Sequence, residues 1–151
     1  MVRESSRIGT PTLIVEFDQE HDCPIDFLGE SSDLVYFISF AYSERYGSDH
    51  DLARLASHLK RDLGINLRPL LTFGDAQCEN SEEEQALEAL WQEAPPLAKC
   101  CRDVAAAVDS TPNLKRLSSD FPDLSDRLGE LGEMAAWASN HSARIRLTYI
   151  L

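Results

Sequence analysis

Residues 143–151, the last segment of the chain, read "ARIRLTYIL" and alternate between apolar and polar side chains. Such alternation predicts a β strand with one buried face, because successive side chains of a strand point to opposite sides. The face expected to be buried carries Ile145, Leu147, Tyr149 and Leu151. An apolar face of this size needs a neighbour, so we expect this strand to pair with another strand of a sheet.

A second alternating segment, "TLIVEFD" at residues 12–18, can supply that neighbour. Leu13, Val15 and Phe17 share one face and Glu16 and Asp18 share the other, which is typical of an edge strand. If the two segments pair, Arg144 and Arg146 lie near Glu16 and Asp18.

Burial should outweigh charge in holding these two strands together. A cross-strand pair contributes up to about 1 kcal/mol, whereas a buried leucine side chain such as Leu147 contributes roughly 1.5–3 kcal/mol. We therefore expect deletion of residues 144–151 to unfold the domain, and Arg146→Ala alone to be tolerated.

The segment "DLVYFISFAY" at residues 33–42 is a nearly unbroken β-branched and aromatic run, which predicts a central strand covered on both faces. A helix is expected next, with Ser48 as its N-cap and Gly64 at its C-terminal end. Residues 65–73, "INLRPLLTF", then predict a strand that Pro69 restricts to an edge or a bulge. Strand, helix and strand in this order imply a right-handed crossover between parallel strands.

The second half of the chain begins with a helical pattern. Ser81 and Glu84 have the spacing of a capping box and introduce an expected helix at residues 82–94. Pro95 and Pro96 would end this helix.

Further helices are expected at residues 97–110, from Pro112 as the first helical position, and within residues 121–141. The last of these regions repeats apolar residues at spacings of four and three, namely Leu124, Leu128, Leu131, Ala135 and Ala138. Such spacing predicts a helix with one buried face.

Together these segments predict a single α+β domain of residues 1–151 with two layers. One layer is a mixed sheet of about four strands that contains one right-handed strand-helix-strand unit. The other layer consists of three to four helices from the C-terminal half, packed on that sheet.

The charge of the chain restricts its partners. It has 26 acidic and 14 basic residues, a formal net charge of −12, which repels phosphate backbones and anionic membrane surfaces. We expect a basic protein partner, with no nucleic acid and no membrane; the pattern does not predict an oligomeric state. The N-terminal residues resemble no signal peptide, which favours the cytoplasm and reduced thiols at Cys23, Cys78, Cys100 and Cys101.

The stretch "EFDQEHDCPID" at residues 16–26 packs carboxylates, a histidine and a cysteine together. Asp18, Glu20 and Asp22 have the spacing that opens a calcium loop, but its sixth position is Cys23 and its twelfth is Gly29, where glycine and glutamate are required. Zinc-type CxxC or HxxxH spacings do not occur. We therefore expect a solvated turn, with no metal and no cofactor.

No nucleophile elbow, phosphate loop or dinucleotide fingerprint occurs in the sequence, so no catalytic residues are predicted. The resulting hypothesis is a non-enzymatic interaction protein of the inhibitor, immunity or adaptor type. It would present an acidic face whose candidate binding residues are Glu16, Asp18, Glu20, Asp22, Glu82 and Glu83.

One resemblance supports an alternative. The segment "VYFISFAYSERYGSDHDLARLASHLKRDLGINL" at residues 35–67 resembles the opening of a TIR-type domain, and "KCCRDVAAAV" at residues 99–108 is loosely similar to that family's helix with the catalytic glutamate. The resemblance implies a small or degenerate enzyme acting on a nicotinamide nucleotide, with a carboxylate in a cleft near Ser39 or Ser43. In the matching helix this chain offers only Asp103.

Overall fold

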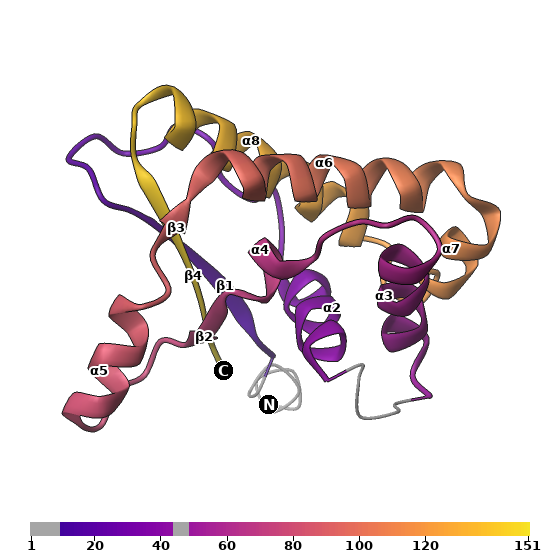
Figure 1. Ribbon diagram of the computed structural model, residues 1–151, viewed down its shortest axis with the longest axis horizontal. Coiled ribbons are helices and arrows are strands. Elements are labelled where there is room, and N and C mark those ends of the chain that lie inside the picture. Colours follow the sequence, from indigo (N-terminus) through magenta and orange to yellow (C-terminus); the bar gives the residue numbers. More distant parts are fainter. Residues whose placement is uncertain (1–9, 44–48) are drawn as a thin grey trace, which may run out of the picture.

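The computed structural model describes residues 10–43 and 49–151. They form an α+β fold in which a four-stranded mixed sheet is combined with seven helices, most of them in the second half of the chain (Figure 1). The strands are β1 (Thr12–Phe17), β2 (Phe73–Asp75), β3 (Gln92–Glu93) and β4 (Arg144–Ile150). The predicted fold class is confirmed.

The last strand is the centre of the sheet. The order is β1-β4-β2, and β3 also pairs with β4. The strand β4 is antiparallel to β1 and β3 and parallel to β2. In the register of β1 and β4, Glu16 lies opposite Arg146 and Phe17 lies opposite Ile145. The predicted strand at the chain end and its pairing beside the first strand are therefore confirmed.

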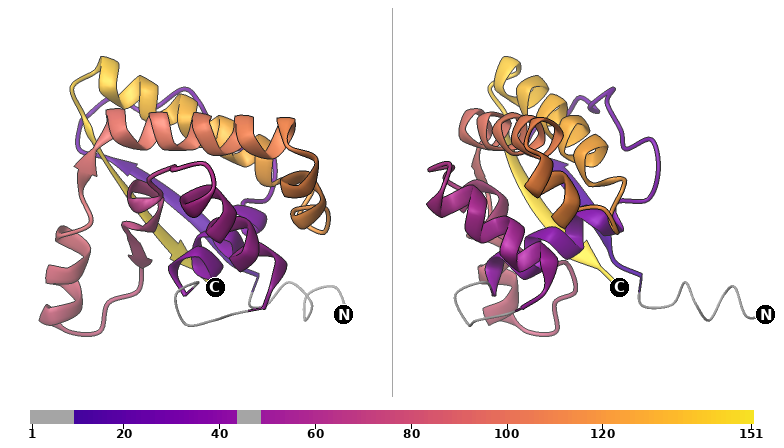
Figure 2. Two further views of the ribbon diagram at one scale, coloured as in Figure 1. Left: turned by 45° about the vertical axis from the view of Figure 1, so that its right-hand side comes forward. Right: turned by 90° about the vertical axis from the view of Figure 1, so that its right-hand side faces the viewer.

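Two long helices, α6 (Ala94–Ser110) and α8 (Leu124–Asn140), lie side by side in both views of Figure 2. The two helices approach closely at Gly132 of α8. A Cβ atom added to this glycine would lie 3.3 Å from the Cβ of Cys101 on α6. The predicted apolar repeat of α8 is fully buried, at Leu124, Leu128, Leu131, Ala135 and Ala138. These side chains join one hydrophobic core with Ile145 and Leu147 of β4.

The expected central strand at residues 33–42 was wrong, because this segment is the helix α2 (Ser32–Tyr42). Its buried residues follow helical spacing, at Leu34, Val35, Phe37, Ile38 and Ala41. A run that is apolar at nearly every position satisfies a buried helix as well as a buried strand. The apolar face of α2 is covered by neighbouring helices and by β1.

The expected strand at residues 65–73 was also wrong for most of its length. A short helix, α4 (Arg68–Leu71), occupies it with Pro69 in its first turn, and only Phe73 belongs to β2. The predicted right-handed strand-helix-strand unit at residues 33–73 is therefore not formed. The parallel pairing in this sheet joins β2 to β4, with Phe73 opposite Leu147.

The helix predicted between these segments is confirmed as α3 (Asp51–Arg61). Its N-cap is His50, whose side chain accepts a hydrogen bond from the N–H of Leu52. The expected cap Ser48 lies outside the described residues. Gly64 follows the helix with a φ of 66°, a left-handed conformation that glycine adopts without steric cost, as expected of a helix end.

The helix expected at residues 82–94 is shorter than predicted, since α5 spans Ser81–Glu88. Its N-cap is Asn80 instead of Ser81, and residues 92–93 form β3. Pro95 and Pro96 stand in the first turn of α6, where a missing N–H costs no helical bond. They begin a helix instead of ending one. The predicted helix start at Pro112 is confirmed by α7 (Pro112–Leu117).

Candidate functional site

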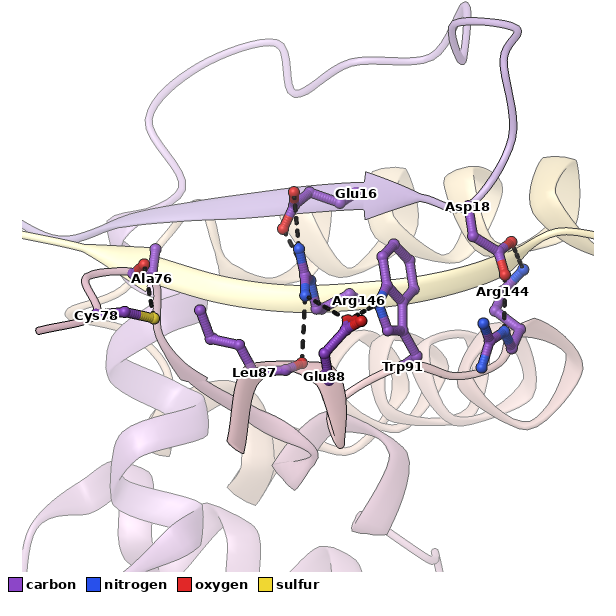
Figure 3. Close-up of polar contacts among 9 residues, drawn as sticks. All are labelled: Glu16, Asp18, Ala76, Cys78, Leu87, Glu88, Trp91, Arg144 and Arg146. Carbon is purple, nitrogen blue, oxygen red and sulfur yellow. Dashed lines mark hydrogen bonds and ion pairs between the residues drawn. The ribbon is translucent and has the colours of Figure 1, made fainter. Parts of the chain in front are cut away.

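Four groups surround Arg146 where α5 meets the sheet (Figure 3). Its Nε and Nη2 donate to the two carboxylate oxygens of Glu16 at 3.0 and 3.1 Å, and its Nη1 donates to the Leu87 carbonyl at 3.3 Å. The same Nη1 lies 3.6 Å from a Glu88 carboxylate oxygen. The guanidinium carbon lies 4.5 Å from the centroid of the Trp91 ring, within the range of a cation–π contact.

A second ion pair joins the same strands two residues farther along, at the end of β1. Arg144 Nε donates to Asp18 Oδ2 at 2.7 Å, and the Arg144 backbone N–H donates to Asp18 Oδ1. Partial burial alone would raise the pKa of Asp18, but its hydrogen bonds to Arg144 and the charge of that guanidinium hold the pKa below its usual value. Glu16 and Asp18 therefore serve the fold, as the sequence pairing predicted.

Glu82 and Glu83 lie in the first turn of α5. The Glu83 carboxylate accepts a hydrogen bond from the N–H of Glu79 at 2.8 Å, while the Glu83 N–H donates to Asn80 Oδ1 at 2.9 Å. This reciprocal capping satisfies N–H groups at the helix start that have no partner within the helix. Glu82 is exposed and forms no ion pair with a described residue.

Glu20 and Asp22 are exposed in the loop that connects β1 to α2, and neither forms an ion pair with a described residue. This loop and the first turn of α5 lie well apart, toward the top and the bottom of the view at the left of Figure 2. The structure thus separates Glu82 and Glu83 on α5 from Glu20 and Asp22 in the loop.

A groove of about 440 Å³ lies between β1, the β1–α2 loop and α8. Its apolar lining residues are Leu13, Val15, Phe17, Ile25, Phe27 and Met134. Its polar lining residues are Glu16, Gln19, His21, Asp22, Cys23 and Asp26. Three acidic residues thus line the groove, and no lysine or arginine does. The carboxylate of one of them, Glu16, is bound to Arg146, so Asp22 and Asp26 are the acidic residues there without an ion pair to a described residue.

Only one side of this groove follows from the sequence. Glu16 and Asp22 were among the predicted binding residues, whereas Asp26, Phe27 and Met134 were not. Met134 comes from α8, more than a hundred residues later in the chain, and nothing in the local pattern connects it to β1. The "CPID" segment itself was a usable signal, because Ile25 and Asp26 repeat the apolar-acidic alternation of β1.

The cysteines form no disulfide. Burial raises the pKa of Cys100 to about 11 and raises that of Cys101 well above its usual value. The partly exposed Cys23 and Cys78 also have raised pKa values, for which desolvation is the largest cause. Among the residues that the structure describes, no three histidine, cysteine or acidic side chains lie close enough together to hold a metal ion.

The elements that carried the TIR resemblance are arranged differently from its expected pattern. The segment that should form its first strand is α2, with Ser39 exposed on that helix and Ser43 at its end. Asp103 lies on α6 and accepts a hydrogen bond from Lys99 Nζ at 2.6 Å. Neither serine follows a strand, so the cleft implied by the resemblance is not built from these residues.

Comparison of the chain with protein-family models, with curated proteins and with solved structures finds no match. Across the described ranges, no helix combines the length and the apolar character needed to cross a membrane.

Proposed function

We propose that this chain is a non-enzymatic interaction protein that binds a basic protein, in the manner of an inhibitor, an immunity protein or an adaptor. The observation that supports the proposal is the groove beside β1, which Asp22 and Asp26 line together with Glu16 and which no lysine or arginine lines. A basic side chain entering this groove meets attraction from Asp22 and Asp26, with no lysine or arginine in the lining to oppose it.

The charge of the whole chain supports the same class of partner. A net charge of −12 speeds diffusional encounter with a positively charged surface and disfavours nucleic acids and anionic membranes. Two of the predicted residues, Glu16 and Asp18, are paired with arginines of β4. The binding role therefore falls to the unpaired carboxylates, of which Asp22 lies in the groove.

Affinity capture with the full chain tests this proposal. The tagged protein is incubated with an extract of the cells that produce it, at low and at high ionic strength, and captured proteins are identified by mass spectrometry. Since the sequence predicts a cytoplasmic protein, the soluble fraction is the starting material. We expect one enriched protein with a basic surface, released as salt screens the charges.

Two charge-neutralised variants sharpen the capture experiment. Asp22→Asn removes a groove carboxylate, while Glu82→Gln removes an exposed carboxylate from α5 with the same change in net charge. Capture should weaken more in the first variant than in the second. Enrichment of acidic or neutral proteins only, or a partner retained fully at high ionic strength, contradicts the proposal.

A further inference from the structure

We propose that the groove binds an extended, basic segment of the partner as an additional strand on the free edge of β1. This inference rests on the function proposed above, because it assigns the place and the mode of binding to the same basic partner.

Hydrogen bonds at both ends of β1 show which of its backbone groups face outward. The N–H of Asp18 donates to the Arg144 carbonyl at 3.2 Å, toward β4. The N–H of Leu13 donates to Ser31 Oγ at 2.8 Å, away from β4. Because the backbone groups of successive residues point to opposite edges of a strand, Leu13, Val15 and Phe17 direct theirs outward.

The outer edge of β1 is open along Val15 and Phe17. The strand β1 is at the end of the sheet order, with β4 on its inner side. The Ser31 hydroxyl satisfies the outward N–H of Leu13, but no described residue bonds to the outward backbone groups of Val15 or Phe17. A lysine, a proline or a bulge often protects such an edge, and residues 12–17 contain no lysine or proline. These groups are the template that strand addition uses.

The groove lies along this open edge. Val15 and Phe17 line it together with Ile25, Phe27 and Met134, and the acidic residues Asp22 and Asp26 belong to the same lining. Lysine and arginine side chains match such a surface, because their stems are apolar and their heads are cationic. Backbone pairing would supply affinity, and the groove would select the basic side chains.

A second copy of the same chain is a poor occupant. It would bring another net charge of −12 to the edge and, if it paired through its own β1, would place a second acidic groove beside the first. Like charges in such close contact oppose association. The same argument excludes acidic segments of other proteins.

A synthetic peptide of about eight residues, the length of an ordinary strand, tests the inference directly. It alternates lysine and valine and carries a fluorophore, so that anisotropy reports its binding to the full chain. Two further versions are N-methylated at the odd or at the even positions. Methylation keeps the side chains and charges but removes the N–H donors of one edge of the peptide. We expect saturable, salt-sensitive binding that one methylated version loses by about tenfold or more, and no binding of a glutamate–valine peptide.

Matched protein variants place the peptide on the chain. Asp22→Lys and Glu82→Lys change the net charge equally, one in the groove and one on α5. We expect the first to weaken peptide binding at least about tenfold and the second at most about threefold, the part that long-range charge explains. Val15→Pro removes an outward N–H and spares the inward ladder bonds of β1. It should also weaken binding about tenfold, provided that its thermal unfolding remains cooperative.

Cysteine modification gives a readout that does not depend on affinity. Cys23 lines the groove and Cys78 does not, and both are partly exposed. Saturating peptide should slow the reaction of Cys23 with a maleimide several-fold and leave that of Cys78 unchanged.

The outcomes separate the two proposals. Equal binding of the unmethylated and both methylated peptides, or equal losses in the two lysine variants, overturns strand addition in the groove. If the partner captured from cells binds Asp22→Lys and Val15→Pro as well as it binds the wild type, the groove assignment is wrong and the proposed function stands. If the wild type captures no basic partner, the proposed function fails and the inference fails with it.

Discussion

Arg146 and Glu16 face each other across β4 and β1 and share two parallel hydrogen bonds of 3.0 and 3.1 Å. The same guanidinium also donates to the Leu87 carbonyl and lies against the Trp91 ring. The helix α5 has no buried residue of its own. Arg146 is therefore a principal contact that holds α5 to the sheet.

Arg146→Ala should consequently cost more than the sequence alone suggested. Charge-assisted hydrogen bonds contribute about 1.5–3 kcal/mol when formed, and removal of Arg146 breaks several at once in a half-buried setting. We expect the free energy of unfolding, measured by urea denaturation, to fall by about 2 kcal/mol. Backbone amides of α5 should also exchange faster with solvent.

Arg146→Lys and Arg144→Ala are the controls for this prediction. Lysine keeps the charge but cannot form the two parallel bonds to Glu16, so an intermediate loss is expected. Arg144 is about half exposed, with a side-chain exposure of 51%, and exposed pairs contribute at most about 1 kcal/mol. A loss from Arg146→Ala no greater than that from Arg144→Ala would contradict the role assigned to Arg146.

Thr148→Val should stabilise the protein. Thr148 is 1% exposed in the centre of β4, and its hydroxyl has no hydrogen-bond partner among the described residues. A buried polar group without a partner costs about 1–3 kcal/mol, and valine has nearly the same shape. We expect a gain of about 1 kcal/mol in urea denaturation. Thr12→Val, on the exposed end of β1, is the control and should change little; destabilisation by Thr148→Val would show that the hydroxyl has a partner.

The sequence predicted those elements whose pattern had a readable period. The strands β1 and β4 alternate, and α8 repeats its apolar residues at spacings of four and three, so their faces and even the Arg146–Glu16 pairing followed. The segment at residues 33–42 is apolar at nearly every position, so its pattern does not distinguish a helical period from that of a strand. The exposed positions Tyr36 and Ser39 are three residues apart, which is a helical spacing and was the one available signal.

The groove was only partly predictable for a different reason. Glu16 and Asp22 stand close together in the sequence, whereas Met134 reaches the groove through the packing of α8 against the rest of the core. Contacts of that range depend on tertiary structure, which local periodicity does not encode. The proline pair before α6 shows the same limit, since a proline can precede a helix or follow one.

The ion pair of Asp18 with Arg144 predicts a dependence of stability on pH. The pKa of Asp18 is lower in the folded chain than in the unfolded chain, so its stabilising contribution is present above the unfolded pKa and is lost as the pH falls through the folded pKa. Asp18→Asn should therefore be less stable than the wild type at neutral pH, by at most about 1 kcal/mol. The difference should shrink below about pH 4. A difference that stays constant down to acid pH would contradict this assignment.

The cysteines should react with a thiol reagent in two groups. Cys100 and Cys101 are buried and have strongly raised pKa values, so little thiolate is accessible at pH 8. Cys23 and Cys78 are partly exposed and should react first. Mass spectrometry after short labelling should locate the modification on these two, with full labelling only in denaturant. Early labelling of Cys101 would mean that the α6–α8 contact opens readily.

Truncation of Leu147 should test whether β4 holds the sheet together. Leu147 is fully buried and lies opposite both Val15 of β1 and Phe73 of β2. Leucine to alanine in a packed core costs about 2–5 kcal/mol, a large fraction of the 5–15 kcal/mol that stabilises a typical domain. Leu151→Ala is the matched control, because Leu151 is 75% exposed and its loss should be nearly neutral. Deletion of residues 144–151 removes the strand with which all three others pair, and we expect it to abolish cooperative unfolding. If the shortened chain still melts cooperatively, the helices form a core that does not require the sheet.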